Sequence, residues 1–166
     1  MQIVFYPDPV LQKRAVEVEP GTEEVAALAA EMVRVMREAK GVGLAAPQVG
    51  RSVRLFVASE TGAAEDALIC VNPALETSGP LVAFEEGCLS LPGLLAEVRR
   101  PRSARLRAFD AQGRPFEREA DGLLARIFQH EMDHLDGILF IERVSEADRI
   151  RLRPDLKSFQ EQYRPQ

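Results

Sequence analysis

Two histidines four residues apart constrain the fold of this chain more than any other feature. His130 and His134 are the only histidines among 166 residues, and both lie in the segment 129–137. Side chains four residues apart share one face of an α-helix, so the pattern predicts a helix whose two imidazoles reach one metal ion. Glu131 is turned by about 100° from His130. Its carboxylate therefore lies beside such an ion, as a base and not as a ligand. A buried helix whose histidines bond to the backbone is the alternative.

The third ligand of such a site must come from elsewhere in the chain. Catalytic sites of the His-Glu-x-x-His type use three protein ligands and leave one position open for water. Cys88 lies in segment 85–93, where glycine and proline favour exposed, closely approaching backbone. Glu142 and Glu146 are the alternatives, although only a short stretch of chain follows them. Cys70 lies in an apolar run and is expected to be a core residue. We therefore expect Cys88 to be the third ligand.

Composition limits the class of protein. A length of 166 residues with 46% apolar and 28% charged residues favours one globular domain over residues 1–166. The net charge of −5 gives no sign of a nucleic-acid partner. The five arginines between positions 99 and 107 are expected to form a solvated strand face with salt bridges. Neither a secretory signal nor a run of ~18 apolar residues for a membrane span is visible, so we expect a cytoplasmic protein without a membrane partner.

The order of the expected elements predicts the fold class. We expect a helix over 22–40, a glycine-rich loop over 41–50, strands over 53–59, 68–75, 81–84, 104–110, 115–120 and 138–144, and a polar helix or tail over 145–166. Thr22 and Asp121 are the expected N-caps, and Gly41 and Gly137 are expected to end the two helices. Because the strands come in a run between the helices, we predict an α+β fold with antiparallel strands packed around the helix that carries His130.

Three segments together resemble the motifs of one known family. They are Gly41-x-Gly43-Leu44-Ala45-Ala46-Pro47-Gln48, Glu86-Gly87-Cys88-Leu89-Ser90 and Gln129-His130-Glu131-x-Asp133-His134-Leu135-x-Gly137. Their sequences, order and spacing are similar to those of bacterial peptide deformylases. The beginning of the chain, residues 6–11, is similar as well, and the resemblance covers residues 1–144, which are the expected catalytic core.

The resemblance implies an enzyme that removes the formyl group from the N-terminal methionine of nascent polypeptides. It implies one divalent metal ion, Fe²⁺ in the cell with Zn²⁺, Ni²⁺ or Co²⁺ as substitutes, bound by Cys88, His130 and His134. Glu131 is then the general base and afterwards the acid. The oxyanion site consists of the Gln48 side-chain amide and the backbone N–H of Leu89. The implied partners are formyl-methionyl chains and, because these are nascent, the ribosome.

A pocket for the methionine side chain should lie beside the metal and be largely apolar. The residues expected to bind substrate are Gly43, Leu44, Phe84, Gly87, Leu123, Arg126 and Ile127. The two glycines let a substrate backbone run close, as an added strand. Arg126 interrupts the apolar lining. Either its stem covers the pocket while its charge reaches water, or it is a structural partner for an acid such as Glu86.

Two competing functions are distinguishable from this one. A small metallopeptidase that cleaves internal bonds would use the same helix motif but a downstream His or Glu as third ligand. A non-catalytic metal-binding module would need a closed site with four ligands, and the sequence offers no convincing fourth ligand.

Overall fold

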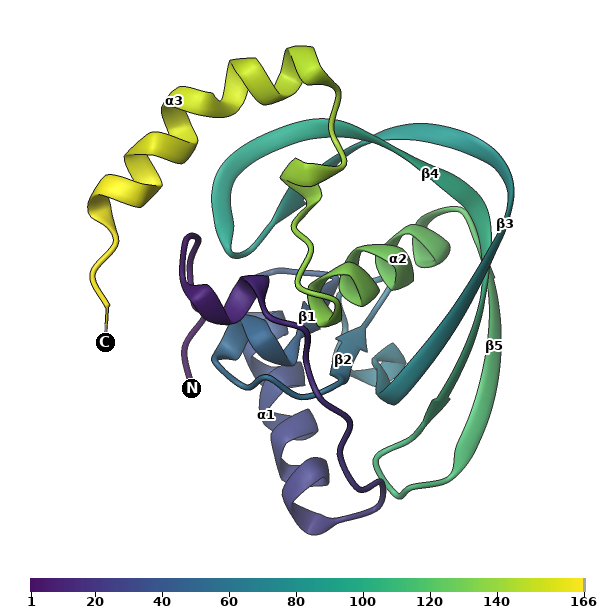
Figure 1. Ribbon diagram of the computed structural model, residues 1–166. Coiled ribbons are helices and arrows are strands. Elements are labelled where there is room, and N and C mark those ends of the chain that lie inside the picture. Colours follow the sequence, from purple (N-terminus) through teal and green to yellow (C-terminus); the bar gives the residue numbers. More distant parts are fainter. Residues whose placement is uncertain (166) are drawn as a thin grey trace.

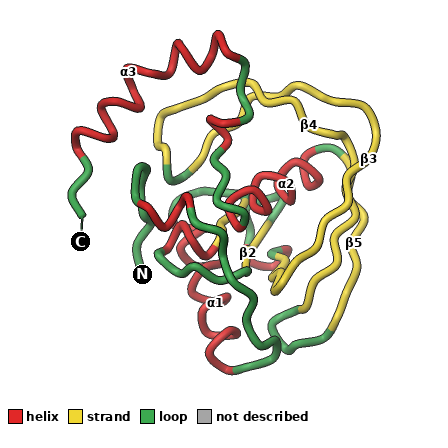
Figure 2. The backbone as a smooth tube through the Cα atoms, viewed as in Figure 1, coloured by secondary structure: helices red, strands yellow, loops and turns green. Residues whose placement is uncertain are grey.

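The structure is a computed structural model and describes residues 1–165. Its helices and strands are α1 (Glu23–Glu38), β1 (Gly43–Ala45), β2 (Leu55–Ala58), β3 (Leu68–Cys88), β4 (Leu91–Phe109), β5 (Pro115–Asp121), α2 (Leu123–Leu135) and α3 (Glu146–Gln162). Short 3-10 turns are formed by Pro9–Gln12, Ala46–Val49, Ala64–Asp66 and Phe140–Glu142. Figures 1 and 2 show the arrangement of these elements.

The strands form one antiparallel sheet that surrounds α2. Their order is β1-β2-β3-β4-β5, and the long β3–β4 hairpin curls around the helix (Figure 1). Phe128 of α2 is fully buried and its ring centroid lies 6.1 Å from that of Phe56 on β2. Leu106 of β4 is buried in the same core. The predicted α+β fold, with antiparallel strands around the motif helix, is thus confirmed.

Helix α1 begins at the predicted N-cap but ends one residue earlier than expected. The Thr22 hydroxyl accepts a hydrogen bond from the Val25 N–H at 3.1 Å and is the predicted N-cap. At the other end the Gly41 N–H donates to the Met36 carbonyl at 2.9 Å. Lys40, with φ 58°, takes the left-handed position that we assigned to Gly41. The helix therefore ends in a Schellman motif one residue earlier than expected.

The motif helix α2 starts differently from the prediction but ends as predicted. Its N-cap is Gly122, with φ 65°, and no side chain caps it. Asp121 was the expected cap, but it is the last residue of β5, where its carboxylate accepts from the Ser103 hydroxyl at 2.8 Å. Gly137, with φ 77°, follows the C-cap, and the Ile138 N–H donates to the Asp133 carbonyl at 2.8 Å. This second Schellman motif confirms the role predicted for Gly137.

The expected strands 68–75 and 81–84 are two parts of one continuous strand, β3. Gly79 and Pro80 resemble a turn in the sequence, but the pairing with β4 only shifts register between Ser78 and Leu81. Gly79 takes a φ of 86° at this irregularity, which a bulge tolerates without ending the strand. Strand β4 likewise begins at Leu91, well before the predicted position 104. The hairpin therefore extends far enough to carry its tip to the motif helix.

The prediction of a strand over 138–144 was wrong. Phe140–Glu142 form a 3-10 turn, and the Leu139 N–H donates to the Glu142 carboxylate at 2.7 Å. Leu139 and Phe140 are adjacent in the sequence and both are buried, so this run lacks the alternation of a half-buried strand. Ser145 then caps α3, so the C-terminal segment is a helix, as one of our two expectations had it. No helix of the described residues is long and apolar enough to cross a membrane.

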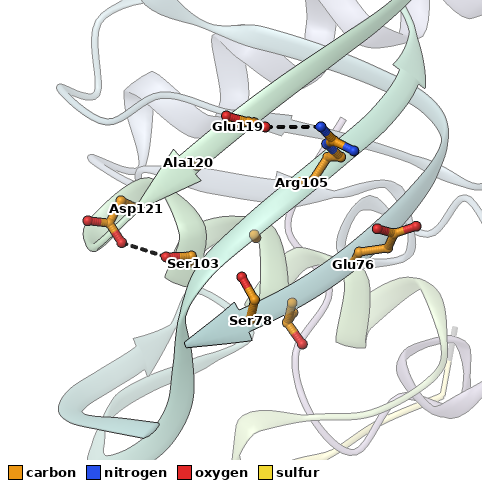
Figure 3. A pocket seen from close by; sticks show the side chains of 9 residues that line it. Glu76, Ser78, Ser103, Arg105, Glu119, Ala120 and Asp121 are labelled. Atoms are coloured by element: carbon orange, nitrogen blue, oxygen red, sulfur yellow. Dashed lines mark hydrogen bonds and ion pairs between the residues drawn. The ribbon is translucent and has the colours of Figure 1, made fainter. Parts of the chain in front are cut away.

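The outer face of the sheet carries most of the basic cluster predicted from the sequence. Arg105 bonds to Glu119 at 3.1 Å, and Arg107 to Glu117 at 3.0 Å. A polar recess of about 520 Å³ lies on this face. Figure 3 shows the residues that line it, with the Arg105–Glu119 and Ser103–Asp121 contacts between its strands. Arg102, Arg105 and Arg107 thus form the expected solvated salt-bridge face. The prediction was wrong for Arg100 of the same cluster, which is buried and bonds to Glu86 and Asp133.

Candidate metal centre and substrate cavity

The three predicted ligands come together between the end of β3 and the inner face of α2. The Cys88 Sγ lies 3.4 Å from the His134 Nε2, which lies 3.2 Å from the His130 Nε2. All three atoms are within 4.8 Å of one another. Tetrahedral bonds of about 2.0–2.3 Å to nitrogen and sulfur separate the ligand atoms by about 3.3–3.6 Å. The three residues therefore fit one divalent ion.

Glu86 fixes the orientation of the first histidine. The His130 Nδ1–H donates to the Glu86 Oε1 at 2.9 Å, which leaves its Nε2 free to face the ligand cluster. Arg100 donates to both oxygens of this carboxylate, at 2.7 Å and 3.1 Å. Burial raises the pKa of Glu86, but the hydrogen bonds from His130 and Arg100 outweigh it and lower the pKa to about 2. Glu86 is thus an anion held in place beneath the imidazole.

His134 is a neutral imidazole deep in the site. It is buried on the last turn of α2, and burial together with the neighbouring His130 lowers its pKa well below the usual value. Metal ions bind neutral imidazole nitrogen, so this environment favours the ligand form. Its Nδ1 has no hydrogen-bond partner among the described residues.

Glu131 lies beside the ligands and not among them, as the helical spacing predicts. Its side chain is buried, and its Oε1 has no hydrogen-bond partner among the described residues. Burial raises the pKa of this carboxyl to about 7. Gly43 packs against it so closely that a Cβ atom there would lie 2.5 Å from the Glu131 Oε2. Gly43 therefore makes room for this carboxylate, a reason for glycine that the sequence did not suggest.

The Gln48 amide is turned so that its nitrogen faces the centre. Its Oε1 accepts the Ala45 N–H at 2.9 Å, which fixes the rotamer. Its Nε2 donates to the Ser90 hydroxyl at 3.2 Å and reaches the Cys88 Sγ at 3.5 Å. Leu89 lies between Cys88 and Ser90, in the tight turn between β3 and β4. Both Gln48 and Leu89 line the cavity beside the ligand cluster.

A cavity of about 430 Å³ opens next to these groups. It is bordered by the β1 segment, the end of the β3–β4 hairpin and one face of α2. The predicted site residues that line it are Gly43, Gln48, Phe84, Gly87, Cys88, Leu89, Leu123, Arg126, Ile127, His130 and Glu131. Such a concave, largely apolar space with a few convergent polar groups is typical of a small-ligand site.

Comparison with known proteins identifies the family. Residues 1–150 match the family described as polypeptide deformylase. The chain belongs to the polypeptide deformylase family. The peptide deformylase of Alkalilimnicola ehrlichii is 42% identical over 166 residues, which cover 99% of this chain and 93% of that protein. The crystal structure of peptide deformylase from Thermus thermophilus superposes with a TM-score of 0.90 at 46% identity and covers 98% of both chains.

The relatives include an organellar protein. Peptide deformylase 1B of Arabidopsis thaliana, described as chloroplastic/mitochondrial, is 41% identical over 98% of this chain and 61% of its own length. Membership of the family makes this chain a peptide deformylase, an enzyme that removes the N-formyl group from nascent peptides.

One residue expected in the substrate pocket of this deformylase lies elsewhere. Leu44 is fully buried and packs in the core with α1, away from the cavity. Side chains alternate along a strand, so Gly43 of β1 faces the cavity and its neighbour faces the core. Arg126, whose role the sequence left open, lines the cavity and also bonds to the Glu86 Oε2 at 2.6 Å.

The deformylase site also contains groups that sequence reasoning did not assign. Glu86 precedes Cys88 by two residues, and its place in that motif was the available signal for a role at the centre. Arg100 had no local signal, because it reaches Glu86 across the β3–β4 hairpin. Asp133 lies within the histidine motif, and its carboxylate accepts from Arg100 at 2.9 Å. Val42 and Leu95 are half-exposed apolar residues at the rim of the cavity.

Proposed function

We propose that Cys88, His130 and His134 hold the metal of this deformylase and that Glu131 moves the proton. The observation that carries the proposal is the position of Glu131: a buried carboxylate with one unpartnered oxygen among the described residues, on the cavity wall directly beside the ligand cluster. A divalent metal at these ligands would supply the Lewis acidity that lowers the pKa of water and polarises the formyl carbonyl.

The side chains then perform the remaining steps. Glu131 accepts a proton from the attacking water and returns it to the amine that leaves the formyl carbon. The Gln48 amide and the Leu89 N–H donate to the formyl oxygen as negative charge develops on it. The Gln48 rotamer is fixed by Ala45, so this donor is oriented before substrate arrives. One such donor contributes about 3–4 kcal/mol to transition-state stabilisation in other enzymes.

The cavity next to Glu131 is proposed to hold the methionine side chain. Phe84, Leu123 and Ile127 give it apolar walls, and Gly87 also lines it. A Cβ atom on Gly87 would come within 2.9 Å of the Leu95 Cδ2, so glycine here keeps the rim open. The formyl carbon then lies at the metal end of the cavity, beside Glu131 and Gln48.

The identity of the metal and the cellular context are proposed on the family resemblance. We infer Fe²⁺ in the cell, with Zn²⁺, Ni²⁺ or Co²⁺ as working substitutes for the same thiolate and imidazole ligands. Residues 1–144 are proposed to be the catalytic core of one domain, with α3 packed on it through Leu152. We further propose a cytoplasmic enzyme that acts at the ribosome, where its nascent substrates emerge. Co-sedimentation of the protein with ribosomes at physiological salt tests that partner.

Formate release tests the proposed site. The protein is purified without oxygen and loaded with Fe²⁺, and formyl-Met-Ala-Ser is compared with casein as substrate. We expect formate from the tripeptide, no cleavage of casein, and loss of both metal and formate release in Cys88→Ala. A Cys88→Ala variant that kept its metal and its activity would show that another residue is the third ligand, and cleavage of casein would favour a peptidase.

A further inference from the structure

We propose that Arg126 is a positioning residue that holds Glu86 against His130 from the side of the substrate cavity. The proposal rests on the assignment of His130 as a metal ligand. It goes further because it gives the arginine in the pocket wall an effect on the metal centre, which it does not itself contact.

The guanidinium of Arg126 makes three hydrogen bonds within the protein. Its Nη1 donates to the Glu86 Oε2 at 2.6 Å and to the Val98 carbonyl at 3.0 Å, and its Nη2 donates to the Val82 carbonyl at 2.6 Å. The guanidinium carbon lies 5.6 Å from the centre of the Phe84 ring. Arg126 is only 9% exposed. A rigid guanidinium with carbonyl and carboxylate partners on both strands of the hairpin is fixed in position.

Glu86 shares its first arginine, Arg100, with Asp133, and Arg126 is its second cation. Arg100 bonds to both oxygens of Glu86, but its Nη1 also donates to Asp133 at 2.9 Å. Asp133 has its own second cation, Arg143, which donates to both of its oxygens at 2.8 Å and 3.1 Å. The two carboxylate oxygens of Glu86 have different sets of donors. Oε1 accepts from His130 and Arg100, and Oε2 accepts from Arg100 and Arg126.

Loss of Arg126 would act on the imidazole through the carboxylate. Without its Nη1 donor, the Oε2 of a buried anion loses one of two partners, and the carboxylate gains freedom to rotate about its remaining bonds to Arg100. That rotation moves Oε1, the atom that orients His130. Groups that orient a ligating histidine change metal affinity by about 10–100-fold when removed. Arg126 is one hydrogen bond further from the metal than Glu86, so we expect metal affinity to fall about tenfold, the lower end of this range.

The experiment measures the metal centre directly. Co²⁺-loaded native protein and Arg126→Met are compared by competition with a chelating dye and by the visible absorption of Co²⁺. Methionine keeps an unbranched apolar side chain in the cavity wall but donates nothing to Glu86. We expect Co²⁺ affinity to fall about tenfold and the absorption bands to shift. Arg126→Leu, which also lacks a donor, serves the same comparison if the methionine variant does not fold.

Arg54→Met is the matched control. Arg54 is also a buried arginine, with its Nη1 on the Leu135 carbonyl at 3.0 Å and its Nη2 on Asp136 at 3.1 Å, and it does not touch Glu86. We expect lower stability in this control but Co²⁺ affinity within about twofold of native. If the folded Arg126 variant binds Co²⁺ within about threefold of native with unchanged bands, or if Arg54→Met loses affinity equally, Arg126 is a structural residue and the proposal is wrong.

A wrong assignment of the metal ligands would give a different pattern of Co²⁺ binding from a wrong role for Arg126. In that case native protein and Cys88→Ala would bind Co²⁺ with the same affinity, which would overturn both the ligand set and the role of Arg126. Native binding that Cys88→Ala loses, together with native-like binding by Arg126→Met, overturns the positioning role alone.

Discussion

Alanine at position 43 should disable the proposed general base without removing the metal. The backbone of Gly43 does not have a left-handed φ, so alanine is compatible with its conformation. The obstacle is the Glu131 carboxylate: a new Cβ would lie 2.5 Å from its Oε2 and 2.9 Å from its Cδ, whereas ordinary contact begins at 3.4 Å. Relief by the carboxylate alone requires a shift of about 0.9 Å, the difference between 3.4 and 2.5 Å. The three atoms nearest to the new Cβ all belong to Glu131, and none belongs to His130 or His134.

A displacement of that size has a predictable effect on turnover. Misplacing a catalytic group by 1 Å can lower a rate about 100-fold, which corresponds to about 2.7 kcal/mol of activation free energy. We therefore expect Gly43→Ala to lower kcat for formyl-Met-Ala-Ser about 100-fold, with native metal content by mass spectrometry. KM should change much less, because the methionine pocket walls remain.

Gly41→Ala is the control for this prediction. A Cβ there would come within 2.9 Å of the Leu89 Cδ1, the end of a flexible side chain that can rotate away. We expect its kcat to stay within a few-fold of native. If Gly43→Ala retains kcat within about threefold, or loses activity through KM alone, then the contact between Gly43 and Glu131 does not control the position of the base.

Three further predictions concern other parts of the molecule. Gln48→Leu should lower kcat about 100- to 1,000-fold with little change in KM, because one donor to the developing charge is lost; unchanged kcat in steady-state assays would exclude that role. In metal-free protein iodoacetamide should modify Cys88 but not Cys70, because Cys70 is fully buried and burial raises the pKa of its thiol. Added Zn²⁺ should protect Cys88 from the reagent. Peptide mapping measures the labelling of each cysteine, and labelling of Cys70 without denaturant would contradict the prediction. Phe128→Ala should lower the free energy of unfolding by about 3–5 kcal/mol in urea titrations, since the ring is fully buried against Phe56; a loss below about 1 kcal/mol would show that this core is not tightly packed.

Local chemistry explains why much of the site was predictable. The spacing of His130 and His134 and the offset of Glu131 are properties of any α-helix, so the sequence alone placed them correctly relative to one another. The caps at Thr22 and Gly137 were also local, because each depends on residues within one turn. Cys88 was assigned by elimination and by its glycine-flanked loop, and the structure brings its sulfur to the histidines.

Features that depend on distant partners were not predictable in this way. The Gly79-Pro80 pair resembles a turn, but pairing with β4 carries β3 past it as a bulge. Residues 138–144 form a short apolar run, for which periodicity does not distinguish a strand from a buried turn. Asp121 has the side chain of an N-cap, but Ser103 on the neighbouring strand holds it in β5. Leu44 adjoins Gly43 in its motif, yet the pleat of β1 directs it to the core.

The central claim is that Glu131 transfers the proton while three other residues hold the metal. The most direct test is Glu131→Gln, with metal content and kcat measured on the same preparation. Glutamine keeps the size and hydrogen-bonding reach of the side chain but cannot accept the proton. We predict one metal per chain, as in the native protein, and a fall in kcat of about 100- to 10,000-fold. Full activity in this variant would contradict the role of Glu131, and loss of the metal would show that Glu131 is itself a ligand.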